Sequence, residues 1–245
     1  MSICIIPARG GSKRIPGKNI LPFCGKPMIV WSIEAAVAAN CFERIIVSTD
    51  DKHVAEIAKA ANAEVPFVRP SALADDHATT VTVMQHAIEF LATEGKLPEA
   101  LCCLYATAPF VSAADLYRGA TALQDADFAM PVTRYAFPIQ RAVRIDDAGQ
   151  VQMFHPEFHS TRSQDLEEAL HDAGQFYWGR TSAWQSDVPL FEQRVMPIEL
   201  PRWRVQDIDT PEDWTQAEAM FHALRKHRCE STWHHSCNQP VPIDH

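Results

Sequence analysis

Short apolar segments alternate with longer helical segments through the first 132 residues, and this alternation restricts the chain to few folds. Strands are expected at residues 3–7, 44–50, 64–68, 100–105 and 128–132, and helices at 27–37, 52–61, 81–94 and 112–123. This order predicts an α/β fold in which helices cover both faces of a mostly parallel sheet. Ligands bind beyond the carboxyl ends of the strands in such sheets. The residues expected to share that crevice are Arg9, Asp50, Arg69 and Thr107.

The first apolar segment leads directly into a loop that is rich in glycine and in cations. Gly10 and Gly11 allow the backbone to approach a ligand closely. Four cations accompany them within ten residues: Arg9, Lys13, Arg14 and Lys18. Backbone amides and cations that converge after a buried strand are typical of phosphate binding. A solvated surface loop is the alternative for such a charge run, and the strand before it favours nucleotide or phosphate binding.

The same loop is not a Walker-type P-loop. Five residues separate Gly11 from Gly17, where that motif requires four residues between its glycines. Asn19 follows Lys18, where the motif places the Ser or Thr that contacts magnesium. The loop therefore predicts a different kind of triphosphate site.

Composition limits the partners that the chain can have. Its 245 residues, 47% of them hydrophobic, suit one α/β domain with a modest insertion. The net charge of −9 argues against nucleic acid, so the cationic loop favours an anionic small molecule. No segment predicts a membrane span or a signal peptide, and no membrane partner is expected. Seven cysteines without a C-x-x-C pair indicate reduced thiols and a cytoplasmic location.

Asp207 and Asp209 form a second group with chemical potential. Residues two apart in an extended chain point to the same side, so the two carboxylates are expected to converge. Such a pair suits Mg²⁺ that also binds substrate phosphates. The alternative is that one aspartate caps the next helix and the other forms a salt bridge. That helix is expected from Pro211 to about Lys226, with Thr210 as its cap.

The regular alternation ends after residue 132. Residues 133–179 contain scattered aromatics, with a β-ribbon expected from 139–145 that turns at 147–149, and a helix only at 163–170. A further strand is expected at 194–200. The tail from residue 229 to 245 is expected to be flexible. Its histidines and cysteines leave a zinc site open as an alternative.

The segment at positions 7–19, PARGGSKRIPGKN, resembles the signature of the cytidylyltransferases that activate keto-sugars with CMP, the CMP-sialic acid synthetase family. The resemblance extends from residue 3 to about residue 224. It implies a Rossmann-like, three-layer nucleotide-diphospho-sugar transferase fold in one domain over residues 1–228. It also implies a homodimer, in which the insertion at about 133–180 closes the partner's sugar pocket.

The resemblance also implies an activity. CTP and a nine-carbon 2-keto sugar acid would give the CMP-sugar and pyrophosphate, with Mg²⁺ held by Asp207 and Asp209. The expected catalytic residues are Arg9, Lys13, Lys18 and Asp209. The expected CTP-binding residues are Ala8, Arg9, Gly10, Gly11, Ser12, Asn19, Arg69, Ala78 and Thr80. The expected sugar-binding residues are Tyr105, Thr107, Arg141, Arg162, His171, Gln175 and Tyr177.

Two departures from the sialic acid enzymes bear on the sugar. Residues 105–109 read YATAP where those enzymes carry QPTSP, and residues 170–174 read LHDAG where they carry Y-R-x-N-G. These and neighbouring segments resemble the pseudaminic acid branch of the family. Because His171 replaces the arginine near the sugar carboxylate, Arg141, Arg144 or Arg162 is expected to hold that carboxylate.

Three alternatives remain open on the sequence. The same chemistry could act on N-acetylneuraminic, legionaminic or keto-deoxyoctonic acid. A sugar-1-phosphate nucleotidyltransferase would also have a Gly-rich, basic first loop. The third alternative is a non-catalytic nucleotide-binding protein.

Overall fold

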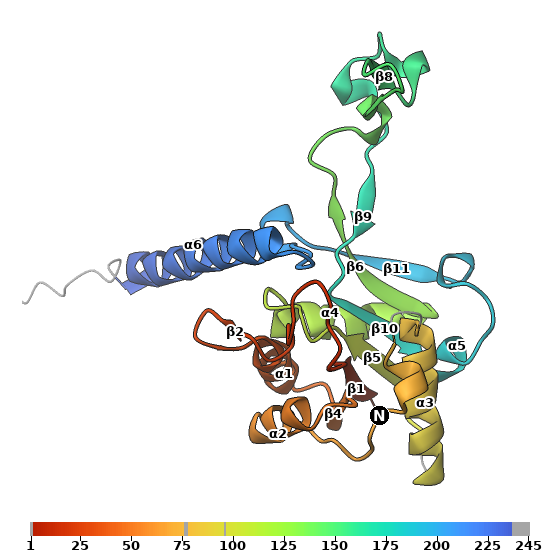
Figure 1. Ribbon diagram of the computed structural model, residues 1–245, viewed down its shortest axis with the longest axis vertical. Coiled ribbons are helices and arrows are strands. Elements are labelled where there is room, and N and C mark those ends of the chain that lie inside the picture. The colour runs from red at the N-terminus through yellow and green to blue at the C-terminus, as the bar shows by residue number, and fades with distance from the viewer. Residues whose placement is uncertain (1, 76–77, 96, 237–245) are drawn as a thin grey trace, which may run out of the picture.

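A central β-sheet organises the computed structural model, which describes residues 2–75, 78–95 and 97–236 (Figure 1). Within these residues the sheet has seven strands in the order β11-β6-β10-β5-β1-β4, with β9 paired to β6. The strands are β1 (Ser2–Pro7), β4 (Arg44–Ser48), β5 (Ala100–Leu104), β6 (Phe128–Arg134), β9 (Leu170–Asp172), β10 (Phe176–Arg180) and β11 (Val195–Glu199). The pairing of β1 with β4 and β5 is parallel, as is that of β11 with β6, whereas β10 runs antiparallel between β5 and β6. The expected largely parallel α/β fold is confirmed.

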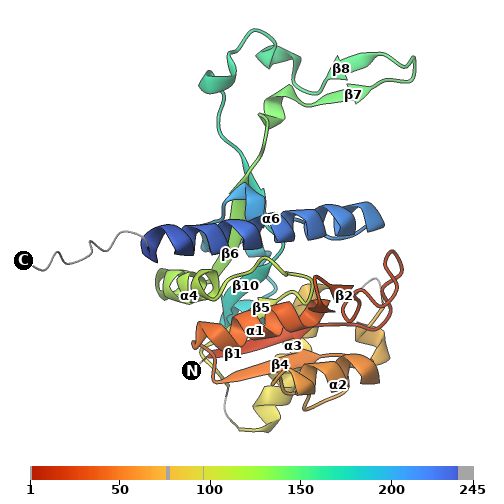
Figure 2. The ribbon, with the colours of Figure 1, turned by 90° about the vertical axis from the view of Figure 1, so that its left-hand side faces the viewer.

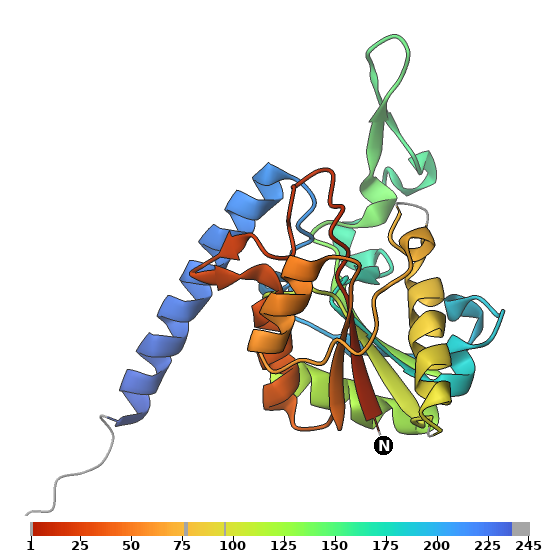
Figure 3. The same ribbon diagram turned by 60° about the horizontal axis from the view of Figure 1, so that its bottom comes forward.

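Helices cover both faces of this sheet. They are α1 (Met28–Ala39), α2 (Lys52–Ala60), α3 (Thr80–Thr93), α4 (Ala113–Ala122) and α5 (Thr181–Trp184), whereas α6 (Pro211–Ser236) packs in a separate apolar cluster with Phe23, Met28 and Phe110. Alternate residues of β1 point to opposite faces, so Cys4 and Ile6 pack with α1, α2 and α4, whereas Ile3 and Ile5 pack with α3 and α5. Figure 3 shows α1 and α2, in red and orange, across the sheet from the yellow α3.

Local capping residues explain where several helices begin and end. Asp51 accepts hydrogen bonds from His53 N and Val54 N at the start of α2. Ser112 accepts one from Asp115 N at the start of α4. Asn40 ends α1 in the left-handed conformation that an asparagine tolerates. These residues fix the helix bounds from local chemistry, which is why the expected bounds are close to the observed ones.

Two expected elements are wrong. Residues 64–68 are not a strand, because only Glu64 bridges to Ile46 and Pro66 then lacks the N–H that would continue the ladder. Residues 163–170 are not a helix. They form a single 3₁₀ turn at Ser163–Asp165, after which Leu166 adopts an extended backbone and buries its side chain.

Residues 135–169 leave the sheet and form a projection that we call the arm (Figure 2). It carries the expected β-ribbon, here the antiparallel pair β7 (Val143–Ile145) and β8 (Val151–Met153). Residues 139–141, expected as the start of that ribbon, form a 3₁₀ turn instead. Residues 170–172 and 176–180, expected within the insertion, belong to the central sheet as β9 and β10. The excursion is therefore shorter than the expected 133–180.

Helix α6 extends further than expected, to Ser236 instead of about Lys226. No glycine or proline interrupts the sequence between Pro211 and Pro240, so nothing local ends the helix at Lys226. Residues 229–236, expected in a flexible tail, are therefore helical, and residues 237–245 lie outside the described residues. The side chains of the tail on which the zinc alternative depends lie outside the described residues; the described part of the chain holds no group of three ligand-type residues for a metal ion. In the described residues no helix is both long and apolar enough to cross a membrane.

Candidate functional site

A cleft of about 520 Å³ lies at the carboxyl ends of β1 and β5. The predicted residues that line it are Arg9, Ser12, Lys13, Lys18, Asn19, Arg69, Ala78, Thr80, Tyr105 and Thr107. Arg14 and Thr79 line it as well. Among the described residues no carboxylate does, so the expectation that Asp50 faces this crevice is wrong, and Asp207 and Asp209 lie outside its lining. A concave surface with this excess of positive charge suits a polyanion such as a nucleoside triphosphate.

The cationic loop is tied to the sheet by its backbone. Ala8 N donates to Ser48 O at 2.9 Å, which continues the pairing of β1 with β4. Gly10 N donates to the Asp50 carboxylate at 2.9 Å, and Asn19 Nδ2 donates to Arg9 O at 2.9 Å. These bonds hold the loop in one shape beside the cleft.

Three residues expected to bind CTP do not line the cleft: Ala8, Gly10 and Gly11. Ala8 is buried in the core, because its position continues the strand ladder beneath the cleft. Gly10 lies against Asp51, where an added Cβ would approach the carboxylate to 2.7 Å. A side chain at Gly11 would meet no atom within 4 Å. Close packing against Asp51 accounts for a glycine at position 10, whereas no contact within the described residues requires one at position 11.

Arg69 and Arg9 connect the cleft to the segment that precedes α3. Arg69 is buried and donates to the carbonyl and hydroxyl oxygens of Ser48. Burial lowers the pKa of Arg69 to about 10, so its guanidinium remains charged at neutral pH. Arg9 Nη1 donates to Asp75 O at 2.6 Å, and the Asp75 carboxylate accepts from Ala78 N. Arg69 thereby joins this wall of the cleft to the end of β4, and Arg9 joins it to the segment before α3.

Asp207 and Asp209 flank a residue that fixes their direction. Ile208 is 1% exposed and packs among aromatic side chains that include Phe23 and Phe221. Because side chains alternate in an extended segment, both carboxylates face away from that core. Burial raises the pKa of Asp207 and the neighbouring charge of Asp209 raises it further, while Lys18 opposes both.

The aspartates meet the cationic loop although some 190 residues separate them in sequence. Lys18 Nζ donates to Ile208 O at 2.7 Å and lies 3.2 Å from Asp209 Oδ1. Arg14 Nη1 lies 2.8 Å from Asp209 Oδ2. The expected meeting of the two groups is confirmed.

The alternative for this aspartate pair is observed in part: Asp209 forms salt bridges with Arg14 and Lys18, but neither carboxylate caps the helix. The carboxylate of Asp213 accepts from Asp209 N and Thr210 N, and Thr210 Oγ1 accepts from Asp213 N. Thr210 is therefore the cap, as expected. Two adjacent carboxylates, one with a raised pKa, fit a divalent cation that takes its remaining ligands from water and phosphate.

Tyr105 forms another wall of the site, and Tyr177 contacts its ring. Tyr105 lines the cleft, its hydroxyl lies 3.2 Å from Thr80 Oγ1, and its ring centroid is 5.5 Å from that of Tyr177. Tyr177 donates its hydroxyl to the Asp172 carboxylate. Burial raises the pKa of both phenols, which therefore remain protonated hydrogen-bond donors at neutral pH. Asp172 was not among the expected site residues.

Five expected sugar-binding residues do not line the cleft of their own chain, and Tyr177, whose ring lies against that of Tyr105, is one of them. Arg141 and Arg162 lie on the arm, where Arg141 donates to Thr161 O and Arg162 contacts Asp165. His171 packs against Tyr135 and lines a separate cleft of about 720 Å³. Gln175 is buried and donates its amide to Arg204 O at 2.6 Å. The arm carries Arg141 and Arg162 away from the sheet. Contacts with Tyr135 and Arg204 hold His171 and Gln175 outside the cleft.

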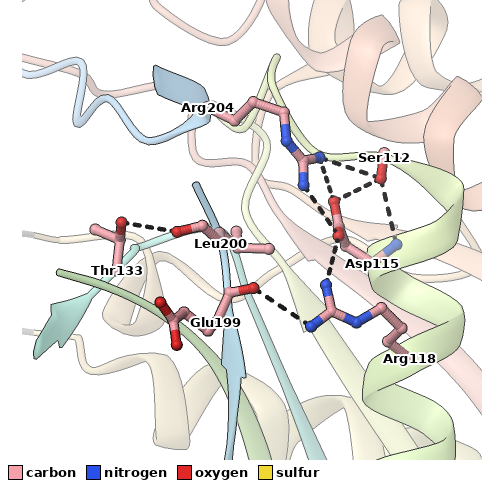
Figure 4. Close-up of polar contacts among 7 residues, drawn as sticks. All are labelled: Ser112, Asp115, Arg118, Thr133, Glu199, Leu200 and Arg204. Atoms are coloured by element: carbon pink, nitrogen blue, oxygen red, sulfur yellow. Dashed lines mark hydrogen bonds and ion pairs between the residues drawn. The ribbon is translucent and has the colours of Figure 1, made fainter. Parts of the chain in front are cut away.

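A buried ion pair next to the aspartates has no signal in the sequence. Arg204 reaches Asp115, at the start of α4, with two of its nitrogens, and Ser112 contacts both side chains (Figure 4). The partners are 89 residues apart, and no spacing rule connects them.

Comparison with known proteins agrees with this geometry. The family model described as Cytidylyltransferase matches residues 3–226. The pseudaminic acid cytidylyltransferase of Campylobacter jejuni is 41% identical over 222 residues, which cover 90% of this chain and 96% of that protein. A Helicobacter pylori protein named pseudaminic acid cytidylyltransferase and UDP-2,4-diacetamido-2,4,6-trideoxy-beta-L-altropyranose hydrolase is 35% identical over 210 residues, 84% of this chain and 40% of that protein.

Solved structures support the same fold. The structure of a CMP:2-keto-3-deoxy-manno-octonic acid synthetase complexed with CTP aligns with a TM-score of 0.67 at 20% identity, and covers 91% of this chain and 98% of that chain. A 4-diphosphocytidyl-2C-methyl-D-erythritol synthase from Anaerococcus prevotii aligns with a TM-score of 0.62 over 90% of this chain and 98% of that chain, at 16% identity. With a family model that matches nearly the whole described chain, and a relative 41% identical over most of its length, this protein belongs to the cytidylyltransferase family.

Proposed function

We propose that this enzyme transfers CMP from CTP to the anomeric hydroxyl of pseudaminic acid, a nine-carbon 2-keto sugar acid, and releases pyrophosphate. The observation that carries the proposal is the contact of Lys18 with Asp209 beside a cleft lined by cations. The similarity to the Campylobacter jejuni enzyme supports pseudaminic acid as the acceptor.

In this proposal the cations of the loop bind the triphosphate. Lys18 contacts the α-phosphate, since its ammonium is fixed by Ile208 O next to Asp209. Arg9 and Lys13 contact the β- and γ-phosphates and neutralise the charge that develops on pyrophosphate. Displacement at phosphorus leaves the protein mainly positioning and electrostatic work, which these side chains supply.

Asp207 and Asp209 would hold Mg²⁺, which would supply charge neutralisation at the phosphates and lower the pKa of the attacking hydroxyl. The sugar hydroxyl attacks the α-phosphorus, a new P–O bond forms, and the bond to the β-phosphate oxygen breaks. The hydroxyl proton passes to a carboxylate of the aspartate pair, in which Lys18 and Arg14 hold Asp209 in place. Tyr105, Thr107 and Tyr177 form the wall against which the sugar lies.

We also propose that the enzyme is a homodimer in which the arm of one subunit completes the sugar pocket of the other. The arm exposes large apolar side chains that a partner would cover: Phe137, Val143, Ile145, Val151 and Phe154. Arg141, Arg144 and Arg162 lie on the same arm, and one of them holds the sugar carboxylate of the partner's site in this proposal. Light scattering should give a dimer for the wild type and a monomer for Ile145→Asp. A monomeric wild type would contradict this proposal.

A pyrophosphate-release assay with CTP tests the proposed reaction. Pseudaminic acid is compared with N-acetylneuraminic, legionaminic and keto-deoxyoctonic acid, and CTP with UTP and GTP. We expect turnover with CTP and the highest kcat/KM with pseudaminic acid. A higher kcat/KM with another keto-sugar would contradict the acceptor. Absence of turnover with all four sugars, or full activity of Asp207→Asn and Asp209→Asn, would contradict the mechanism.

A further inference from the structure

Residues 200–210 bring the aspartate pair to the cationic loop beside the cleft without being part of a strand or α-helix. Their start is fixed at the sheet, where Leu200 N donates to Val132 O at 2.8 Å and Leu200 O accepts from Thr133 Oγ1 at 2.9 Å (Figure 4). A 3₁₀ turn at Arg202–Arg204 follows, and α6 begins at Pro211. Between Leu200 and the start of α6, the position of Asp207 therefore depends on contacts that tie this segment to the rest of the protein; we call these contacts tethers.

Arg204 is the first of those tethers, and both of its ends are held. Arg204 Nη1 donates to Asp115 Oδ2 at 2.5 Å, and Nη2 donates to Oδ1 at 3.2 Å, so the contact is bidentate. The side chains of Asp115 and Arg204 are only 3% and 13% exposed. Arg204 O accepts from Gln175 Nε2, and Gln175 O accepts from the backbone N–H of Tyr105. The backbone at Arg204 is thus joined to α4 and to the strand end at the cleft.

The second tether acts after Asp207. Ile208 is buried, its carbonyl accepts from Lys18, and Asp209 N donates to Asp213. Asp209 is therefore held by its own neighbours. Asp207 lies between the two tethers, three residues after Arg204, a separation that the chain spans with at most about 10 Å. A shift at Arg204 would be transmitted mainly to Asp207.

We propose that Arg204 is a positioning residue, whose bidentate contact with Asp115 sets the direction of the Asp207 carboxylate toward the metal-phosphate site. This inference rests on the proposed metal role of Asp207 and Asp209. Arg204 does not line the cleft and acts only through the backbone of residues 205–207. An ion pair that served stability alone would leave metal affinity unchanged in the folded protein.

Arg118 provides a matched control. Arg118 Nη1 donates to the same Asp115 carboxylate at 3.3 Å, but Nη2 donates to Glu199 O, which precedes the segment that carries the aspartates. Removing Arg118 therefore removes one charge from Asp115 and leaves Arg204 in place. Both Arg118→Met and Arg204→Met remove a contact with Asp115, but only Arg204→Met removes one made by the segment that carries Asp207.

The experiment compares these two variants, with Arg204→Lys and Asp115→Asn, in the full-length protein. Mn²⁺ binding is measured by electron paramagnetic resonance with a non-hydrolysable CTP analogue, and kcat and the KM for CTP are measured in the pyrophosphate assay. We expect Arg204→Met to weaken Mn²⁺ binding and to lower kcat by about tenfold each, the lower end of the range for residues that orient metal ligands. We expect the KM for CTP to change less than about twofold, because the cations that bind the triphosphate are untouched.

The other variants complete the test. Arg204→Lys keeps the charge but only one contact, so its Mn²⁺ affinity should lie between those of the wild type and Arg204→Met. Asp115→Asn weakens the same contact from the other side, so its Mn²⁺ affinity should also be lower than that of the wild type. If Arg204→Met folds poorly, Arg204→Lys and Asp115→Asn provide the test instead. Equal Mn²⁺ affinity in Arg204→Met, Arg118→Met and the wild type would overturn the inference. Mn²⁺ affinity that stays at the wild-type value in Asp207→Asn and Asp209→Asn would instead overturn the proposed metal site.

Discussion

Gly10→Ala is the substitution whose effect follows most directly from the structure. Gly10 lies against the first turn of α2, and an added Cβ would lie 2.7 Å from Asp51 Oδ2 and 2.8 Å from Asp51 Cβ. Rotating the carboxylate relieves the first contact but not the second. The Cβ–Cβ distance is about 0.6 Å shorter than the 3.4 Å at which ordinary contact begins, so the backbone of the loop or of the helix start has to move.

Two costs set the magnitude. Overpacking of this kind typically costs about 1–3 kcal/mol. Asp51 also caps α2, and loss of a capping side chain costs about 1 kcal/mol. We therefore expect Gly10→Ala to lower the free energy of unfolding by about 2 kcal/mol, and the Tm by about 6 °C in a chain of this length. Because Gly10 N also holds the cationic loop to Asp50, the KM for CTP should rise about tenfold.

Urea and thermal unfolding measure the stability, and the pyrophosphate assay measures the KM. Gly11→Ala is the control for stability, because its Cβ would meet no atom within 4 Å and the free energy of unfolding should change by less than about 0.5 kcal/mol. Asp51→Gly removes the obstructing Cβ and, since glycine is an adequate N-cap, costs only a few tenths of a kcal/mol. Gly10→Ala should therefore be nearly neutral in the Asp51→Gly background.

Equal stabilities of Gly10→Ala and Gly11→Ala would refute this reasoning. So would a loss of stability in the Asp51→Gly background as large as that in the wild type, because the cost would then not arise from the contact with Asp51.

Three further substitutions test the site. Lys18→Met removes the cation beside Asp209 and should lower kcat/KM about 100-fold in the pyrophosphate assay, and a decrease below threefold would contradict its role. Tyr177→Phe removes the hydrogen bond to Asp172 and should raise the KM for the keto-sugar about tenfold, whereas an equal rise for CTP would contradict its place in the sugar wall. Burial raises the pKa of Asp115, but hydrogen bonds from its arginine and serine partners outweigh this effect and lower it. The wild type should therefore be more stable than Asp115→Asn above about pH 4, and urea unfolding should show this difference shrink as the pH falls through the folded-state pKa. A difference that is independent of pH would contradict the ion pair.

Local features of the sequence predicted the elements that depend on local chemistry. The first strand and the helices that follow it were predicted within a few residues, because apolar periodicity and caps such as Asp51 and Ser112 lie within the elements themselves. The meeting of Lys18 with Asp209 was predicted through the resemblance of the first loop to a family motif. Spacing alone left the role of the aspartates open.

The remainder depended on contacts between distant residues. Strand β10 was assigned to the insertion, because residues 176–180 show no sign that they pair with β5 and β6 on both edges. Arg141 and Arg162 were assigned to a pocket that the arm of their own chain does not approach. The ion pair of Arg204 with Asp115 joins two segments that share no local pattern. In each case the deciding partner lies far away in the sequence.

The position of β10 has a consequence for how the chain folds during synthesis. Strands β4, β1 and β5 can pair as soon as residue 104 is available, but β6 joins them only through β10, whose residues follow the whole arm. The ribosome must therefore release about 180 residues before the two halves of the sheet can become continuous. Until then β5 presents an unpaired edge, and an edge of this kind is a template for pairing with a neighbouring chain.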